Sequence, residues 1–104
     1  GKNQNKGIKM NEITITFEKE NNRSAAYDDG KLIGVCEYEL KENDWVIYHT
    51  AVDTQYTGQG IAKRLLQSVI DNARAAQVKI IPECSFAVKV MSENPSYADV
   101  IANQ

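Results

Sequence analysis

Two glycines in the middle of the chain, Gly58 and Gly60, stand between an apolar segment that ends at Val52 and an amphipathic segment that follows at once. A strand that turns through such a loop into a helix aims unpaired backbone N–H groups and the positive end of the helix dipole at one point. A phosphate group binds well at such a point. The spacing therefore predicts a site for a phosphorylated ligand, although a tight strand-to-helix turn also needs glycines for purely structural reasons.

Two common phosphate-binding motifs do not fit this loop. It has no lysine followed by Ser or Thr, which disfavours a P-loop nucleotidase. Lys63 stands where the dinucleotide-binding motif requires its third glycine. The remaining pattern is an apolar strand, a polar loop with Gly58 and Gly60, and a helix that opens on Lys63, Arg64 and two leucines.

One thiol and one imidazole are the candidate reactive groups. Cys84 follows an apolar segment that is expected to pair in parallel with the strand carrying His49, and ligands of open α/β sheets gather at such carboxyl ends. A helix beginning beside Cys84 favours a thiolate there. His49 is then placed to orient or deprotonate that thiol, or to take a proton from an incoming amine. The structural alternatives are a cysteine that packs as a small apolar group and a strand histidine bonded to its neighbours.

Hydrophobic periodicity indicates the elements that position these groups. Strands are expected over 12–17, 24–27, 32–40, 45–52 and 78–81, helices over about 60–76 and 85–92, and a last helical turn over 97–101. The order strand, helix, strand between 45 and 81 implies a right-handed crossover and a parallel pair.

The segment 45–52 is apolar on both faces, as is typical of a strand in the middle of a sheet. Strict alternation along this strand places His49 on the same face as Trp45 and Ile47, with Val52 on the other face.

The segment Thr57-Gly58-Gln59-Gly60-Ile61-Ala62 resembles the pyrophosphate loop of the GNAT superfamily of acyl-CoA N-acyltransferases, whose pattern is Gln/Arg-x-x-Gly-x-Gly/Ala. Gly60 and Ala62 match the pattern, and Thr57 replaces the usual Gln or Arg. The chain is also similar to a subgroup of minimal, YjdJ-type GNAT-like domains, through His49-Thr50-x-Val52, the loop, Cys84-Ser85-Phe86 and Asn94-Pro95-x-Tyr97. In that subgroup the position of Cys84 is associated with a nucleophile or a thiol close to the acyl group.

The resemblance implies an α+β, minimal GNAT-like fold, with a mixed, mainly antiparallel sheet of about five strands, a long helix after the fourth strand and a C-terminal helix. It implies acetyl-CoA as co-substrate, with the pyrophosphate on the N–H groups of the loop and the thioester carbonyl against a backbone N–H near Val52. The cofactor-binding residues predicted in this way are Val52, Thr57, Gly58, Gln59, Gly60, Ile61, Ala62, Lys63 and Arg64, and the predicted catalytic residues are Cys84 and His49.

The expected activity is transfer of an acetyl group to an unidentified amine, either directly or through Cys84. Only the turn at Asn21-Asn22 separates the first two strands, where the superfamily usually inserts helices that build the acceptor wall. The alternatives are therefore a non-catalytic acyl-CoA-binding module and a protein-interaction module.

The chain has 104 residues, enough for one small domain. Residues 1–9 are expected to be a disordered leader or an expression remnant, and residues 10–104 a single GNAT-like acyl-CoA-binding domain. The net charge of −2 argues against nucleic acid or an anionic membrane as the main partner. Two cysteines, Cys36 and Cys84, and a single histidine predict no metal site and no disulfide framework. With no signal peptide or membrane span in view, the expected location is the cytoplasm.

Overall fold

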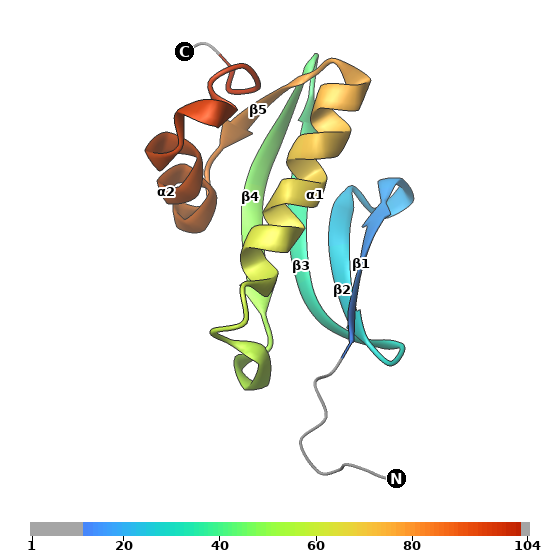
Figure 1. The fold of residues 1–104 in the computed structure, drawn as a ribbon. Helices are drawn as coiled ribbons and strands as arrows, with labels where there is room; N and C mark the ends of the chain where they lie inside the picture. Colours follow the sequence, from blue (N-terminus) through green and yellow to red (C-terminus); the bar gives the residue numbers. More distant parts are fainter. Residues whose placement is uncertain (1–11, 103–104) are drawn as a thin grey trace, which may run out of the picture.

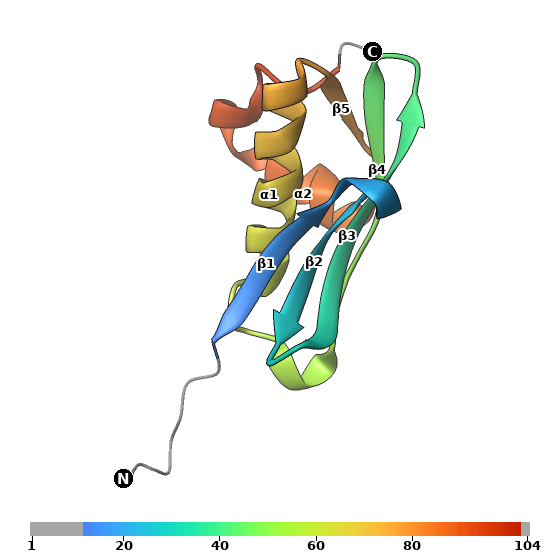
Figure 2. The ribbon, with the colours of Figure 1, turned by 90° about the vertical axis from the view of Figure 1, so that its right-hand side faces the viewer.

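Five strands form one sheet in the order β1-β2-β3-β4-β5, and two α-helices lie on one of its faces (Figure 1, Figure 2). The computed structural model describes residues 12–102, so the predicted leader at 1–9 lies outside the described residues. The strands are β1 (Ile13–Glu18), β2 (Arg23–Asp28), β3 (Lys31–Lys41), β4 (Asp44–Val52) and β5 (Lys79–Pro82). The helices are α1 (Ile61–Ala76) and α2 (Ser85–Glu93), with short 3-10 turns η1 (Lys19–Asn21), η2 (Thr54–Tyr56) and η3 (Pro95–Tyr97).

The sheet is mixed, as the sequence predicts. Strands β1 to β4 are antiparallel neighbours, and β5 returns through α1 to pair in parallel with β4. The other face of the sheet carries no helix within residues 12–102 (Figure 2). The predicted α+β fold class is confirmed. Neither helix of the described part is long and apolar enough to span a membrane.

Helix α1 packs on the sheet through one apolar stripe, whose spacing of three and four residues puts every member on the same side of the helix. Its buried residues are Ile61, Leu65, Leu66, Val69, Ile70 and Ala73. Ser24 on β2 is also buried, and its Oγ donates to the Leu65 carbonyl at 2.7 Å. The helix ends at its C-cap Gln77, whose N–H donates to the carbonyls of Ala73 and Arg74 and whose left-handed backbone lets the Val78 N–H return to the Ala73 carbonyl at 3.0 Å.

Strand β4 contains a β-bulge at Tyr48. Glu37 on β3 pairs with His49, whereas the next β3 residue, Tyr38, pairs with Ile47, so Tyr48 has no partner on β3. An extra residue of this kind reverses the alternation of side chains beyond it. The bulge divides β4 into two halves, and the alternation of side chains between the two faces of the sheet is shifted by one residue from one half to the other.

The prediction that His49 shares a face with Ile47 and Trp45 is wrong because of this bulge. Beyond it, Thr50 pairs with Cys36 and its Oγ1 lies 3.5 Å from the Cys36 Sγ, on the face that α1 covers. His49 points to the uncovered face, beside Glu37. Val52, predicted on the face opposite Ile47, lies on the same face as Ile47.

The predicted helical turn at 97–101 is present but begins earlier, as η3 at Pro95–Tyr97, and it continues in turns to Val100, whose N–H donates to the Tyr97 carbonyl at 3.0 Å. At its end the chain lies beside β5, where the Ile80 N–H donates to the Val100 carbonyl at 2.7 Å and the Ala102 N–H donates to the Ile80 carbonyl at 2.8 Å. The outer edge of β5 would otherwise expose unpaired backbone groups beside the core. This need for backbone partners explains why residues 100–102 lie beside β5.

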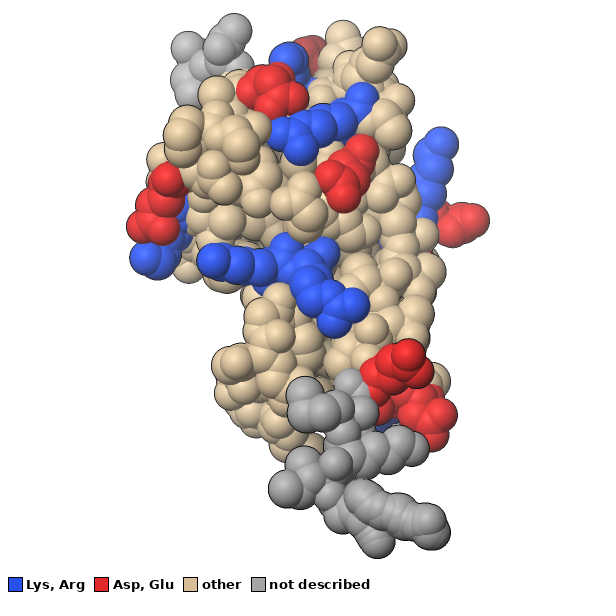
Figure 3. Space-filling view, viewed as in Figure 1, with Lys and Arg blue, Asp and Glu red and all other residues tan. Residues whose placement is uncertain are grey.

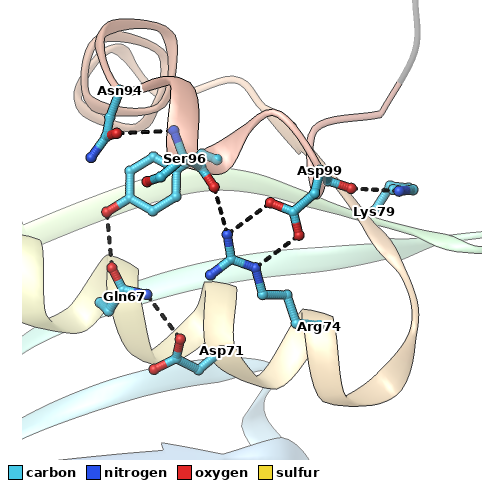
Figure 4. Close-up of polar contacts among 8 residues, drawn as sticks. Gln67, Asp71, Arg74, Lys79, Asn94, Ser96 and Asp99 are labelled. Atoms are coloured by element: carbon cyan, nitrogen blue, oxygen red, sulfur yellow. Dashed lines mark hydrogen bonds and ion pairs between the residues drawn. The ribbon is translucent and has the colours of Figure 1, made fainter.

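Acidic and basic side chains are interspersed on the helical face of the molecule (Figure 3). One such group fixes the C-terminal segment to α1 (Figure 4). The Arg74 guanidinium contacts both carboxylate oxygens of Asp99, at 2.8 and 3.1 Å, and donates to the Ser96 carbonyl at 2.9 Å. Lys79 Nζ donates to the Asp99 carbonyl at 2.5 Å. These contacts hold the C-terminal segment against α1 and β5.

The Arg74–Asp99 pair should make the attachment of this segment depend on pH. The hydrogen bond from Arg74, together with its charge, lowers the pKa of the Asp99 carboxyl. A carboxyl with a lowered folded-state pKa stabilises the fold above its unfolded pKa, and that contribution is lost as the pH falls through the lowered value. We expect Asp99→Asn to lower the urea midpoint at neutral pH, and the difference from the wild type to shrink as the pH falls through the lowered pKa and the wild-type carboxyl takes up a proton. A difference that stays the same over the whole acid range would show that the carboxylate charge is not involved.

Gly34 on β3 marks a close approach of the sheet to α1. A Cβ at this position would lie 3.2 Å from both the Ala51 carbonyl oxygen and the Leu65 Cδ1. We expect Gly34→Ala to destabilise the fold by about 1–3 kcal/mol, the usual cost of overpacking. Urea unfolding measures the effect, and Thr14→Ala on the exposed side of edge strand β1 is the control, with a change below about 0.5 kcal/mol.

Candidate functional site

The loop between β4 and α1 presents a row of backbone N–H groups. Before the row, the N–H groups of Tyr56 and Thr57 donate to the carbonyls of Asp53 and Thr54 at 2.9 and 3.3 Å. After it, the Arg64 N–H donates to the Gly60 carbonyl at 3.2 Å. Within the described residues we find no acceptor for the N–H groups of residues 58–63. These donors are available to a ligand at the N-terminus of α1.

Both glycines of the loop have backbone conformations that favour glycine. Gly58 has a φ of +82° and Gly60, the N-cap of α1, a φ of +76°. A Cβ at either position would meet no atom within 4 Å, so the requirement comes from the backbone angle and not from crowding.

The second half of β4 leaves one edge unpaired. The pairing with β5 ends where Ile47 meets Pro82. On the β3 side, the Asp53 N–H donates to the Ile33 carbonyl at 2.7 Å, which makes Val52 and Gly34 a non-hydrogen-bonded pair. The Val52 N–H therefore points toward the open edge of β4. In the space-filling view the surface is hollowed on this side, below α2 and above the loop (Figure 3).

Cys84 lies beside this open edge as the N-cap of α2. Its N–H donates to the Ile47 carbonyl at 3.0 Å, and its half-buried Sγ accepts the Ala87 N–H at 3.4 Å. The same Sγ lies 3.4 Å from the Thr50 Oγ1. The structure thus brings Thr50 against the thiol, in the place that the sequence assigns to His49.

Cys36 completes a group of three small side chains. It is fully buried, with its Sγ 3.5 Å from the Thr50 Oγ1. Burial raises the pKa of the Cys36 thiol to about 11, despite the opposing effect of the Thr50 hydrogen bond. Cys36 is therefore a neutral thiol at physiological pH.

His49 lies on the uncovered face, where its cross-strand neighbour is Glu37. No hydrogen bond or ion pair within residues 12–102 joins it to Cys84. The sequence does not predict a role for Thr50, because strict alternation of side chains along the strand 45–52 places it on the face opposite Trp45 and Ile47. The one available signal was the run of three apolar residues from Trp45 to Ile47, followed by polar ones, which hints at an irregular strand.

The two basic residues of the first turn of α1 diverge. Arg64 Nη2 donates to the Ile13 carbonyl at 3.2 Å and so reaches across to β1. Lys63 lines a depression of about 290 Å³ together with Val90, Glu93, Asn94 and Tyr97. Lys63 has no polar partner among the described residues. Of the two cations, Lys63 is therefore the one available beside the loop.

The other predicted loop residues have different surroundings. Thr57 Oγ1 donates to the Thr54 carbonyl at 3.0 Å, so this hydroxyl stabilises the turn itself. Gln59 is exposed and Ala62 half-buried, whereas Ile61 is buried in the core. The contribution available from these residues is mainly their backbone N–H groups.

The family model described as GCN5-related N-acetyl-transferase matches residues 23–100. No curated protein matches the chain. Among solved structures, the chain is similar to a Staphylococcus aureus protein described as GCN5-like. The two share 33% identity over 89% of each chain, with a TM-score of 0.67.

Other structures share the fold at lower identity. The ribosomal-protein-alanine N-acetyltransferase from Brucella melitensis biovar Abortus 2308 is 22% identical over 79% of this chain and 62% of its own, with a TM-score of 0.57. The N-acetylglutamate synthase from Neisseria gonorrhoeae, complexed with coenzyme A and N-acetyl-glutamate, is 21% identical over 76% of this chain and 21% of its own, with a TM-score of 0.60. The chain thus spans only part of these two proteins.

The family model covers most of the chain, including β4, the loop, α1 and Cys84. The predicted superfamily is confirmed, whereas the YjdJ-type subgroup stays a prediction. The chain belongs to the GCN5-related N-acetyltransferase family, a family of acyltransferases.

Proposed function

We propose that the chain binds acetyl-CoA at the N-terminus of α1 and transfers its acetyl group to an amine. The observation that carries this proposal is the row of N–H groups at residues 58–63, for which the described residues supply no acceptor. A pyrophosphate is negatively charged and accepts hydrogen bonds at every terminal oxygen, so it suits donors at a helix N-terminus. Lys63 adds a positive charge beside them.

The acyl arm of the co-substrate would lie along the open edge of β4. There the Val52 N–H donates to the thioester carbonyl oxygen, which gains negative charge when the carbonyl carbon is attacked. Cys84 and Thr50 lie at the same edge, near the end of β5. In this proposal the acetyl group lies between the loop and the thiol.

Two routes lead from acetyl-CoA to the acetylated amine. In direct transfer the amine nitrogen attacks the carbonyl carbon, the C–S bond breaks, and CoA leaves as a thiol after taking the proton that the amine loses. In the second route the Cys84 thiolate attacks the carbonyl carbon first, the C–S bond of acetyl-CoA breaks, and the CoA sulfur takes up the proton that Cys84 had lost, so that CoA leaves as a thiol. The amine then attacks the Cys84 thioester and releases the Cys84 thiol. We assign to His49, on the uncovered face, the role of the base that removes the proton from the incoming amine.

Binding without transfer is the second candidate function. Only η1, at Lys19–Asn21, lies between β1 and β2. The uncovered face of the sheet therefore has no helix to form a wall for the amine within residues 12–102. A partner protein that presents its own amine, or a role as an acyl-CoA-binding module, would fit this open face.

Removal of a single loop N–H should weaken binding. Ala62 is in the first turn of α1, where proline is tolerated, so Ala62→Pro deletes one donor and leaves the helix in place. We expect acetyl-CoA to bind this variant about tenfold or more weakly in calorimetry, because hydrogen bonds to charged groups are strong. Ala62→Ser keeps the N–H and is the control. Equal affinity of the two variants would contradict pyrophosphate binding at the loop.

The mass of the intact protein after incubation with acetyl-CoA separates the two routes and the binding module. If Cys84 carries the acetyl group, a single acetyl adduct forms on the wild type and is absent from Cys84→Ala. Acetyl-CoA binding with turnover of an amine but no adduct supports direct transfer. Binding without adduct or turnover supports the binding module. No increase in the unfolding temperature at high acetyl-CoA would refute the proposal, because a ligand of the native state must stabilise it.

A further inference from the structure

Thr50 lies between two thiols that the sequence keeps far apart. Its Oγ1 is 3.5 Å from the Cys36 Sγ on β3 and 3.4 Å from the Cys84 Sγ at the start of α2. The Cys84 Sγ also accepts the Ala87 N–H at 3.4 Å. Cys36 is fully buried, whereas Cys84 is half-buried beside the open edge of β4. Only Cys84 is therefore accessible to a reagent or an acyl donor.

The Thr50 hydroxyl carries one proton, so it donates to one sulfur at a time. While Cys84 is a thiol, Thr50 donates to Cys36 and accepts the Cys84 S–H. If Cys84 loses its proton, its sulfur becomes an acceptor only, and the chain of hydrogen bonds reverses. Cys36 can then donate its S–H to Thr50, because burial raises the pKa of this thiol to about 11 and keeps it protonated.

We propose that Cys36 and Thr50 form a hydrogen-bond relay that stabilises the thiolate of Cys84. In the ionised state the relay runs from Cys36 S–H to the Thr50 oxygen and from Thr50 O–H to the Cys84 sulfur, with the Ala87 N–H as a second donor. Cys36 and Thr50 are both positioning residues that act through Cys84. The catalytic use of the relay rests on the proposed acetyl transfer, but its effect on the thiol does not.

The charged groups near Cys84 do not supply this stabilisation. Glu83 precedes it and is exposed, and Glu37 lies on the uncovered face of β3, so both would oppose an anion. His49 also lies on the uncovered face. On α2, Lys89 pairs with Glu93 at 3.2 Å. Among the described residues, the polar contacts of the Cys84 sulfur are those with Thr50 and Ala87.

The test is the pH profile of Cys84 alkylation by iodoacetamide without acetyl-CoA, followed by the mass of the peptide that contains Cys84. Thr50→Val keeps the shape of the side chain and removes its hydroxyl. We expect it to raise the midpoint of the profile by about one pH unit, a tenfold loss of thiolate below the midpoint, as for a lost hydrogen bond to a charged group. Thr50→Ser restores the hydroxyl and should restore the wild-type midpoint.

Cys36→Ala tests the far end of the relay and should raise the midpoint by less than Thr50→Val does, since the Thr50 hydroxyl remains. Urea unfolding of each variant measures any loss of stability. A loss of stability alone would not raise the midpoint of the alkylation profile in Thr50→Val and let Thr50→Ser restore it. An unchanged midpoint in Thr50→Val, or no recovery in Thr50→Ser, would overturn the relay. An unchanged midpoint in Cys36→Ala would remove Cys36 from it. Because no acetyl-CoA is present, failure of the proposed function would leave these results intact.

Discussion

The separation of β5 from β4 is the constraint on which the candidate site depends. Pairing stops at Pro82, which has no N–H to donate, and the next two N–H groups, of Glu83 and Cys84, both turn to the Ile47 carbonyl. This turn starts α2 at Cys84 and leaves the second half of β4 paired with β3 alone. One local event thus creates the open edge and places the thiol beside it, while the register with β3 points the Val52 N–H into the gap.

The bulge at Tyr48 complements this separation. Without it, His49 would face the helices and Thr50 would face the uncovered side of the sheet. With it, Thr50 contacts Cys84, and His49 lies beside Glu37. A bulge at the point where a strand loses one neighbour is physically reasonable, because the unpaired edge tolerates the local distortion. The thiol consequently lies beside Thr50 on the covered face of β4, and the imidazole lies on its uncovered face.

Much of the fold could be predicted from the sequence, because the signals were local. The apolar stripe of α1 and the Gly58-x-Gly60 loop depend on neighbouring residues only. The bulge could not be predicted in this way, since it is defined by the register between β3 and β4. The bridge between Ile101 and β5 was missed for a similar reason: its partner is Ile80, distant in the sequence, and no local pattern shows which edge needs covering. The same limit hid Thr50, whose neighbours are two cysteines from other elements.

The two halves of the candidate site, the loop before α1 and the group around Cys84, differ in the atoms that they offer to a ligand. The loop offers backbone N–H groups, which every residue except proline supplies, so Thr57 in place of Gln or Arg removes little. The proposed reactive half, around Cys84, uses the side chains of Thr50 and Cys84, and a single substitution can remove either hydrogen-bonding group. If the proposed function holds, acyl-CoA binding is therefore expected to tolerate substitutions better than acetyl transfer does. A chain of this family that keeps the loop but lacks the thiol would still be expected to bind the co-substrate, which makes binding and transfer separate questions.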